Sequence, residues 1–431
     1  MQFRTKARAV DLLGKGQIAD LPTAITELWK NGYDAYADNL TAEIYLDTYK
    51  DVDSPLFVMT DDGKGMSRND ILEKWLVLGT DSKSRATLEE KESEETLWKK
   101  PRIKAGEKGI GRLSVAFLGN PMLMLTKKQG YPLQALFFDW RLLENYNLFL
   151  DDVNIPVEDI NSFDDFHFKL EKLKESFLRN FDKENDTDGN YIWEEKQLGL
   201  RRDIEDSVLK SKIPNFLSKK LLSDLLDIEN SHGTKFIVFE PLDQMIEIAE
   251  VDEDRLGDRR FLASSLAGFT NEFIETGIKV NTSIPIFSNE NSEVDFLTTE
   301  GQFFTSNDYA SADILIDGFF DGQGSFKGTL TVYDEEIEYS YTNPRKKDQR
   351  SFYGCFPLKL GVSQGNFTES KLEEVKFKKI NDKVSNNGGL YIYRDDFRVL
   401  PYGRTDFDFL GFESRRAKRA GSYYFSHRRM F

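Results

Sequence analysis

The chain has 431 residues, and its 74 Asp and Glu outnumber its 58 Lys and Arg, which gives a formal net charge of −16 at pH 7. A chain of this length has room for about two or three domains with sizeable cores. The excess of acidic residues argues against a protein that coats nucleic acid with its whole surface, because such binding depends on many Lys and Arg contacts.

The cysteine and histidine content indicates a reducing compartment without structural metal. Cys355 is the only cysteine, which excludes an intrachain disulfide framework. His167, His232 and His427 are isolated in the sequence, so no zinc cluster is expected. The sequence also lacks an apolar stretch of about 18 residues and the pattern of a signal peptide. We therefore expect a cytoplasmic protein with neither a membrane span nor a secretion signal.

The first predicted element is a helix over residues 21–36 with two distinct faces. Glu27, Asn31 and Asp34 stand at i, i+4 and i+7, so their side chains project from one polar stripe. The amide oxygen of Asn31 suits Mg²⁺, and the carboxylate of Glu27 suits the orientation or deprotonation of an attacking water. Taken alone, the stripe also fits the exposed face of an ordinary amphipathic helix. A separate apolar face is formed by Leu21, Ile25, Leu28 and Ala35.

Two predicted strands follow, and the second ends in a carboxylate. Residues 42–46 alternate between apolar and polar, and residues 56–59 form a continuous apolar run. Asp61 then lies at the end of a buried strand. A carboxylate in that position accepts hydrogen bonds and therefore selects a donor such as an amine. Gly63 and Gly65 let the backbone approach a flat ligand where a Cβ would clash. An ordinary tight turn is the alternative, because Asp-Asp-Gly-Lys-Gly is good turn chemistry.

A highly charged segment precedes the next glycine-rich motif. Residues 79–104 contain too few apolar side chains to pack permanently, so mobility is expected. A lid that closes over a bound ligand and a solvated loop without a gating role are the two interpretations.

The glycine-rich motif contains Gly106, Gly109 and Gly111, and it precedes a predicted helix over 113–118 and a strand over 122–125. Successive glycines before a helix expose N–H groups and the positive end of the helix dipole, so they can cradle a phosphate chain. Lys108 adds a positive charge. A dinucleotide-binding fold is unlikely, because it needs a strand immediately before the glycines and none is indicated there.

Residues 140–230 are interpreted as an insertion. Charged amphipathic helices are expected over 169–181 and 204–226, on either side of the acidic, turn-rich segment 182–190. The insertion is interpreted either as a solvated helical hairpin or as an arm that contacts a partner. Beyond it, residues 232–239 predict a strand that contains Thr234.

Residues 246–431 predict a second α/β domain. A helix is expected within 259–276, and strands are expected over 312–320, 328–333 and 389–399. A basic cluster near the end could face DNA, contact acidic partners or pair with acidic residues of the same chain. It consists of Arg415, Arg416, Lys418, Arg419, Arg428 and Arg429. The aromatic ending leads us to expect that the natural protein continues.

Three segments, in this order, resemble the N, G1 and G2 boxes of the Bergerat-type ATP-binding fold. That fold is shared by gyrase B, Hsp90, bacterial histidine kinases, MutL and the MORC ATPases, which form the GHKL superfamily. The segments are Glu27-Leu-Trp-Lys-Asn31-Gly-Tyr-Asp34-Ala35, Asp61-Asp-Gly63-Lys-Gly65-Met66 and Gly106-Glu-Lys108-Gly109-Ile110-Gly111-Arg. The charged segment, with Thr80 and Lys83, resembles the ATP lid. The strand with Thr234 resembles the Gly-Thr strand beneath adenine in Hsp90-like and MutL-like members.

The resemblance implies an α+β protein with two domains. A Bergerat ATP-binding α/β sandwich is expected over 1–245, with its lid at about 80–112 and the helical insertion at about 140–230. A ribosomal-S5-like α/β transducer domain is expected over 246–431, incomplete at its C-terminus. In such domains a Lys or Arg reaches the γ-phosphate, and Arg394, Arg398 and Arg404 are the candidates within this chain.

The resemblance also implies ATP and Mg²⁺ as ligands. Glu27 is expected to activate water, Asn31 to hold Mg²⁺, and Asp61 to recognise the adenine amine. The other expected nucleotide contacts are Asp34, Gly63, Gly65, Met66, Thr80, Lys83, Gly106, Lys108, Gly109, Ile110, Gly111 and Thr234.

Family members of this kind hydrolyse ATP slowly, and lid closure drives dimerisation of two N-terminal domains. A bacterial DNA-maintenance or anti-phage defence system is the expected setting, with DNA and an effector protein as candidate partners. A nucleotide-sensing scaffold or chaperone-like module with little turnover is the alternative. A histidine kinase fits poorly, because the residues before the first box contain no histidine.

Overall fold

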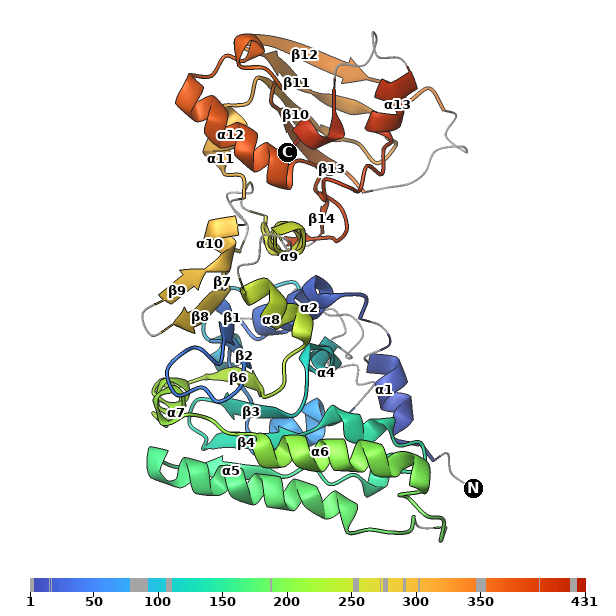
Figure 1. Ribbon diagram of the computed structural model, residues 1–431. Helices are drawn as coiled ribbons and strands as arrows, with labels where there is room; N and C mark the ends of the chain where they lie inside the picture. The colour runs from blue at the N-terminus through green and yellow to red at the C-terminus, as the bar shows by residue number, and fades with distance from the viewer. Residues whose placement is uncertain are drawn as a thin grey trace. The chain divides into compact units, whose positions relative to one another are not determined.

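The computed structural model of the protein shows two compact units (Figure 1). Unit 1 comprises residues 1–259 and 280–299, and unit 2 comprises residues 260–279 and 300–431. The boundary at residue 245 stays a prediction. The structure describes residues 4–14, 16, 18–77, 92–105, 111–186, 188–250, 256–271, 273, 278–289, 292–300, 303–345, 354–394, 396–418 and 425–431.

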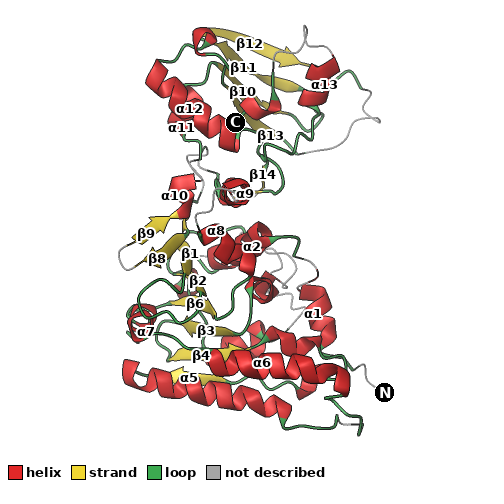
Figure 2. Cartoon of the chain, viewed as in Figure 1, coloured by secondary structure: helices red, strands yellow, loops and turns green. Residues whose placement is uncertain are grey.

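A nine-stranded mixed sheet forms the framework of unit 1 among the described residues (Figure 2). The order is β5-β4-β3-β6-β2-β1-β8-β9, with β7 also paired to β1. Strands β7 and β8 run parallel to β1, and the other pairs are antiparallel. Strands β3, β4 and β6 are buried along their whole length, so both faces of the central sheet are covered. The bounds are β1 (Asn39–Tyr45), β2 (Leu56–Asp61), β3 (Met122–Lys127), β4 (Leu133–Phe138), β5 (Val157–Ile160), β6 (Gly233–Val238), β7 (Asn281–Ser283), β8 (Pro285–Asn289) and β9 (Ser292–Asp295).

Helix α2 (Leu21–Asp34) confirms the predicted first helix and has clear start and stop signals. The side chain of Asp20 accepts a hydrogen bond from the Thr23 amide at 3.0 Å, and Pro22 stands in the first turn. Tyr36 has φ 67°, in the left-handed region, so the helix cannot continue to residue 36 as predicted. The apolar face of α2, including Leu21, is buried.

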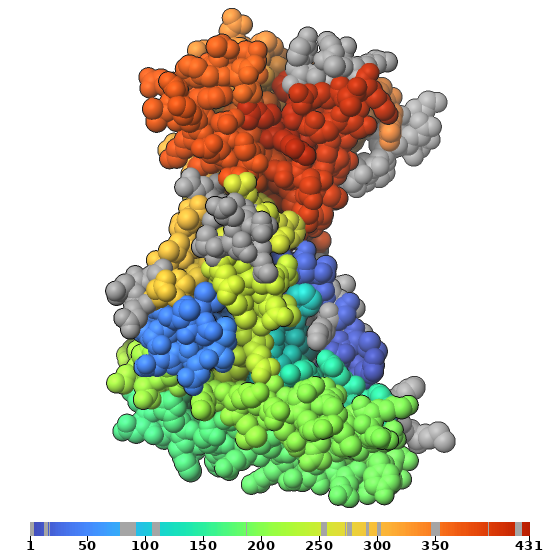
Figure 3. All heavy atoms as spheres, viewed as in Figure 1, coloured from blue at the N-terminus to red at the C-terminus, as the bar shows by residue number. Residues whose placement is uncertain are grey.

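The remaining helices of unit 1 pack around this sheet. They are α1 (Arg8–Gly14), α3 (Arg68–Asp70), α4 (Val115–Leu118), α5 (Phe163–Leu178), α6 (Leu198–Lys210), α7 (Asn215–Leu222), α8 (Asp243–Ala249) and α10 (Phe296–Glu300). Helix α5 packs against β4 and β5, and β5 itself pairs with β4. Part of the expected insertion at 140–230 therefore extends the main sheet. In the space-filling view the residues of α5 and α6 form a broad outer surface of unit 1 (Figure 3).

The helices in this region differ from the predicted pair. The Ser162 side chain and Asp165 form a capping box that starts α5 at Phe163, ahead of the predicted residue 169. The prediction of one helix over 204–226 is wrong, because Pro214 separates α6 from α7. A proline disfavours helical backbone in the residue before it, and Pro214 instead occupies the N-cap position of α7.

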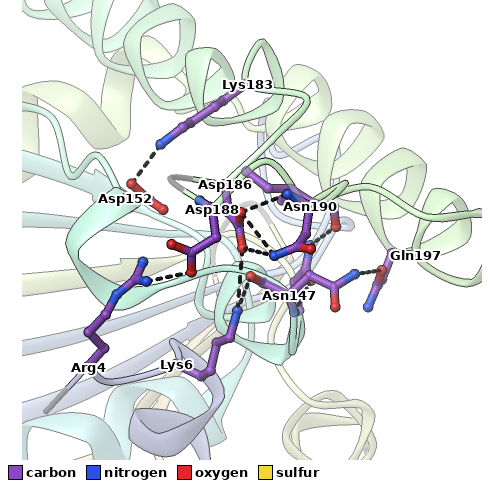
Figure 4. A network of polar contacts seen from close by, with 11 residues as sticks. Arg4, Lys6, Asn147, Asp152, Lys183, Asp186, Asp188, Asn190 and Gln197 are labelled. Atoms are coloured by element: carbon purple, nitrogen blue, oxygen red, sulfur yellow. Dashed lines mark hydrogen bonds and ion pairs between the residues drawn. The ribbon is translucent and has the colours of Figure 1, made fainter.

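The N-terminal segment is tied to the acidic turn at 182–190 (Figure 4). Arg4 pairs with Asp188 at 2.5 Å, and the Lys6 ammonium donates to the Asn147 carbonyl oxygen at 2.6 Å. The Asp186 carboxylate, 3.9 Å from the Lys6 ammonium, also accepts from backbone amides of its own turn. The acidic turn therefore organises the start of the chain instead of remaining a free loop.

Unit 2 is built on a four-stranded antiparallel sheet of order β12-β11-β10-β13. One core cluster contains Phe304, Ile380, Val384 and Phe431, with Leu315 packed against it. A second contains Leu360, Val362 and Met430, with Ile314 and Phe412 against it. Leu315 and Ile314 are neighbours on β10, so the clusters cover opposite faces of the same end of the sheet. The strands are β10 (Ile314–Phe320), β11 (Phe326–Val332), β12 (Glu335–Tyr341) and β13 (Phe356–Val362).

The other elements of unit 2 differ in part from the predictions. The strands expected at 312–320 and 328–333 are confirmed by β10 and β11. The expected strand over 389–399 is instead a short hairpin of β14 (Tyr393–Arg394) and β15 (Phe397–Arg398), joined through Asp396 with φ 69°. The helices are α9 (Leu256–Leu266), α11 (Ser306–Ala310), α12 (Glu374–Asn387) and α13 (Phe412–Lys418). No described helix has the length and hydropathy needed to cross a membrane.

Candidate nucleotide site

The site begins where helix α2 touches the end of strand β2. Gly32 makes this approach possible, because a Cβ there would lie 2.4 Å from a Leu40 methyl group and 2.9 Å from the Asp61 Cβ. Both contacts are shorter than side-chain carbons tolerate. Asn31 is adjacent to Gly32, so the polar stripe of α2 stands beside the carboxylate at the end of β2.

Asp61 is the buried acceptor of the site. Its Oδ1 accepts a hydrogen bond from the Gly63 amide at 3.0 Å. Desolvation by the surrounding protein raises the pKa of Asp61 to about 7, although the Gly63 hydrogen bond opposes the shift. The residue keeps partial solvent exposure. A hydrogen-bond donor that reaches the exposed side of this desolvated carboxylate would stabilise its charged form strongly.

The loop after Asp61 packs too closely for side chains at two glycines. A Cβ on Gly63 would lie 2.7 Å from the Ala35 Cβ and 2.8 Å from Asp61 Oδ1. Gly65 has φ 60°, and a Cβ there would lie only 1.8 Å from the Lys127 carbonyl oxygen on β3. Close packing therefore requires glycine at both positions, and Gly65 also needs it for its backbone conformation.

A row of polar side chains crosses three strands at this point. Asp61 pairs with Thr234 in the β2–β6 register, and Thr234 pairs with Thr126 in the β6–β3 register. Directly paired residues point to the same face of a sheet, so the three side chains share the face on which α2 packs. The Thr126 and Thr234 hydroxyls lie 3.0 Å apart, and Thr126 Oγ1 also accepts from the Met66 amide at 2.9 Å.

Thr126 is a site residue that the sequence analysis missed. Residues 122–125 were recognised as an apolar strand, and the single threonine that follows carried no signal of its own. Its importance comes from the pairing of β3 with β6, which sequence spacing does not reveal.

Further contacts hold the glycine loop against α2. His232 Nδ1 lies 2.9 Å from the Gly63 carbonyl oxygen, and the Lys64 amide donates to the Ala35 carbonyl oxygen at 2.8 Å. The Asp62 carboxylate accepts from the backbone amides of Asp38 and Asn39 at 2.7 and 2.9 Å. Asp62 therefore has a structural role, in contrast to its neighbour Asp61.

The polar stripe of α2 lies as its spacing predicts, half-buried on one face of the helix. Glu27 forms an ion pair with Lys30, with 2.7 Å between Oε1 and Nζ. Asp34 Oδ1 accepts from the Ala105 amide at 2.7 Å. Asp34 therefore ties residue 105 to the end of α2.

Residues 92–105, which we call the strap, are firmly attached to the end of α2. The buried Arg102 guanidinium donates to the carbonyl oxygens of Tyr33 and Ala37 at 3.2 and 2.6 Å, and to Asp38 at 3.0 Å. It also lies 4.8 Å from the centre of the Tyr33 ring. A cation at the carbonyl end of a helix is favourable, so Arg102 joins the strap to α2.

The middle of the strap is fixed to the glycine loop by charge. Glu95 pairs with Lys64 and with Lys128, both at 2.8 Å. Hydrogen bonds from Lys128 and Lys64 lower the pKa of Glu95 to about 2, so it stays ionised at neutral pH. Nearby, Leu97 and Trp98 both have φ in the left-handed region, and the Trp98 side chain is exposed.

Part of the expected phosphate site can be placed. Gly111 begins the 3₁₀ helix η5 (Gly111–Ser114), which packs against α2 and leads into α4. The predicted contacts that lie outside the described residues are Thr80, Lys83, Gly106, Lys108, Gly109 and Ile110.

The candidate γ-phosphate residues have partners inside unit 2. The buried Arg398 guanidinium donates to the carbonyl oxygens of Ser264 and Ala267 at the end of α9. Arg404 pairs with Asp406 at 2.6 Å. The guanidinium groups of Arg398 and Arg404 thus form contacts within unit 2. Their expected role at the γ-phosphate stays a prediction.

The buried acceptor, the close-packed glycine loop and the polar stripe define an α/β nucleotide-binding domain. Residues 19–168 match the family model of the histidine kinase-, DNA gyrase B-, and HSP90-like ATPases. This stretch of the chain is thus a domain of the GHKL ATPase type. No curated protein matches the chain.

Proposed function

We propose that this protein is a Mg²⁺-dependent ATPase. The observation that carries the proposal is the position of Asp61, a desolvated acceptor beneath α2 at the start of a close-packed glycine loop. The adenine amine is a donor of the right chemistry for this carboxylate. Thr234 and Thr126 would bound the same end of the base.

The half-buried stripe of α2 supports the assignment of the phosphate end. Asn31 offers a single amide oxygen, which fits Mg²⁺, because this ion takes most of its ligands from phosphate and water. When bound, the ion would neutralise charge that develops on the phosphates. Glu27 would orient the attacking water, and the glycine-rich motif ending at Gly111 would hold the phosphates with its amides.

The strap suggests how nucleotide would change the shape of the domain. Because residues 92–105 are anchored to α2 and to the glycine loop, nucleotide binding and lid closure would act on the strap through these contacts. Closure would gate dimerisation of two copies and act on unit 2, which we propose to be a transducer domain of the ribosomal-S5-like type. A bacterial DNA-maintenance or anti-phage defence system is the proposed setting.

A second candidate function is a nucleotide-sensing scaffold with little turnover. The observation that favours it is the Glu27–Lys30 ion pair, because a carboxylate that already contacts a neighbouring ammonium is less available to orient water. In that case binding would still depend on Asp61, and Glu27 would be dispensable.

The test compares ATP turnover, nucleotide binding and molar mass in solution for wild type, Glu27→Ala and Asp61→Ala. We expect Glu27→Ala to retain ATP affinity and to lose turnover by roughly 10²- to 10⁴-fold, the range for loss of a general base. Asp61→Ala should lose ATP binding, and Mg²⁺-ATP should raise the molar mass of wild type to that of a dimer. Addition of duplex DNA would show whether DNA stimulates turnover.

Asp203→Ala on the exposed side of α6 is the matched control, and it should behave as wild type. Tight ATP binding without turnover in wild type, and no change in Glu27→Ala, would favour the scaffold. Unchanged ATP affinity in folded Asp61→Ala would contradict the nucleotide site itself.

A further inference from the structure

Strand β12 (Glu335–Tyr341) is an unusually open edge in unit 2. It is the outermost strand of its sheet and pairs only with β11 among the described strands (Figure 1). All seven of its residues are exposed. No described residue outside β11 forms a backbone hydrogen bond with it. An edge of this kind offers a row of backbone donors and acceptors to another extended chain.

Beyond Glu335 at its start, one face of this edge is apolar and continues an aromatic cluster. Ile337, Tyr339 and Tyr341 lie on the same face, and their side chains are 51 %, 52 % and 46 % exposed. Tyr339 lies 6.4 Å from Phe326 between ring centres, and Phe326 in turn contacts Phe320 at 5.1 Å. The apolar surface therefore extends from the edge into the sheet.

The opposite face of the same edge is acidic. Glu336 and Glu338 alternate with the apolar residues, so their carboxylates lie on the other side of β12. From residue 333 to residue 344 the sequence has four acidic residues and no Lys or Arg. The Glu338 carboxylate accepts a hydrogen bond from the Thr329 hydroxyl at 3.2 Å. This donor is neutral, so it does not compensate the negative charge.

We propose that β12 docks an extended segment of a partner protein in which apolar and basic residues alternate. A strand added beside β12 would place every second side chain next to Ile337 and Tyr339, and the intervening ones next to Glu336 and Glu338. Side chains paired across strands lie about 5 Å apart, close enough for apolar contact on one face and ion pairing on the other. The backbone edge supplies affinity, and the two faces select the partner.

The same charges disfavour a second copy of this chain as the occupant. Two β12 strands side by side would bring the glutamates of both copies together, and like charges on neighbouring strands are destabilising. The edge is thus protected against self-pairing while it stays open to a basic strand.

The test uses the full chain and a fluorescent peptide of sequence Lys-Val-Lys-Val-Lys-Val-Lys-Val, with binding followed by fluorescence anisotropy. We expect binding to wild type, and binding weaker by about tenfold or more in Glu336→Lys/Glu338→Lys, because like charges then face each other. Ile337→Thr/Tyr339→Thr keeps good strand residues and should also weaken binding. Hydrogen exchange should slow at residues 335–341 when the peptide is bound.

Two controls separate strand docking from simple attraction to an acidic protein. Asp203→Lys/Asp206→Lys on α6 changes the net charge by the same amount and should leave binding unchanged. The block peptide Lys-Lys-Lys-Lys-Val-Val-Val-Val has the same composition without alternation and should bind more weakly. Equal binding of the two peptides, equal loss in both charge variants, or dimerisation through β12 without peptide would overturn the proposal.

Discussion

The two ends of the proposed ATP site are built in different ways. At the adenine end, helix α2, the ends of β2 and β3 and the glycine loop meet so closely that Gly32, Gly63 and Gly65 have no room for a Cβ. At the hydrolytic end, Glu27 and Asn31 are half-buried side chains on the surface of α2. The first end is part of the core of unit 1, whereas the second is carried by side chains that packing does not require.

This difference separates the effects of mutation. Changes at the adenine end should alter folding and binding together, because the same contacts serve both. A change at Glu27 should alter chemistry more than folding.

Gly65→Ala should be the most damaging of these changes. The new Cβ would collide with the Lys127 carbonyl oxygen at 1.8 Å, and alanine would also have to adopt φ 60°. We expect a loss of roughly 3 kcal/mol or more in the free energy of unfolding, together with loss of ATP binding. Urea unfolding and nucleotide titration measure both effects.

Gly130→Ala is the matched control for this prediction. Gly130 has φ 77°, but a Cβ there has no heavy atom within 4 Å. Only the backbone strain remains, which costs about 1 kcal/mol. Similar losses in the two variants would show that conformation, and not close approach, makes glycine necessary at residue 65.

Asp61→Asn should reveal the energetic cost of the buried acceptor through its pH dependence. The native pKa of about 7 lies above the ordinary value of 3.8, so the folded protein holds the proton more tightly than the unfolded chain. Ionisation of Asp61 therefore lowers the free energy of unfolding. This loss is absent below about pH 4, grows as the pH rises to 7, and then reaches its full size of up to about 4 kcal/mol. Asn carries no charge and removes this dependence.

We therefore expect the stability of nucleotide-free Asp61→Asn, relative to wild type, to increase from pH 4 to pH 8. Unfolding by urea across this range provides the measurement, and a difference that does not vary with pH would contradict a raised pKa at Asp61. The same variant should bind ATP poorly, because an amide cannot accept from the adenine amine as a carboxylate does.

Mutations at the two attachment points of the strap should cost different amounts of stability. Arg102→Gln leaves the carbonyl oxygens of Tyr33 and Ala37 without a charged donor in a buried place, so a loss of about 2 kcal/mol is expected. Glu95→Gln should cost less than about 1 kcal/mol and only at low salt, because its ion pairs are half-exposed. Hydrogen exchange over residues 92–105 in both variants would test this order.

Much of the site was predictable because its residues are adjacent in sequence or follow one helix. Glu27, Asn31 and Asp34 needed only the helical period, and Asp61 needed only the end of an apolar strand. Thr126 could not be found, because its role depends on the pairing of β3 with β6 across a long separation in sequence. The anchoring of the strap was also missed, because a charged composition predicted mobility and concealed the partners of Arg102.

The predictions for individual elements were wrong or incomplete at three places. The helix expected over 204–226 ignored the break that Pro214 imposes. Strands β12 and β13 were not expected, because β12 is open to solvent and carries few of the apolar residues that mark a buried strand. The pairing of β7 and β8 with β1 joins residues 280–299 to a sheet whose other strands all precede residue 240.

Trp98 gives the protein an internal optical probe. Its side chain is 71 % exposed, whereas Trp29 is 1 % and Trp75 is 9 % exposed, and the other two tryptophans are half-buried. A collisional quencher such as acrylamide should therefore act mainly on Trp98. Most of the emission that it removes comes from the strap, so movement of this segment can be followed in the unlabelled protein at stopped-flow speed.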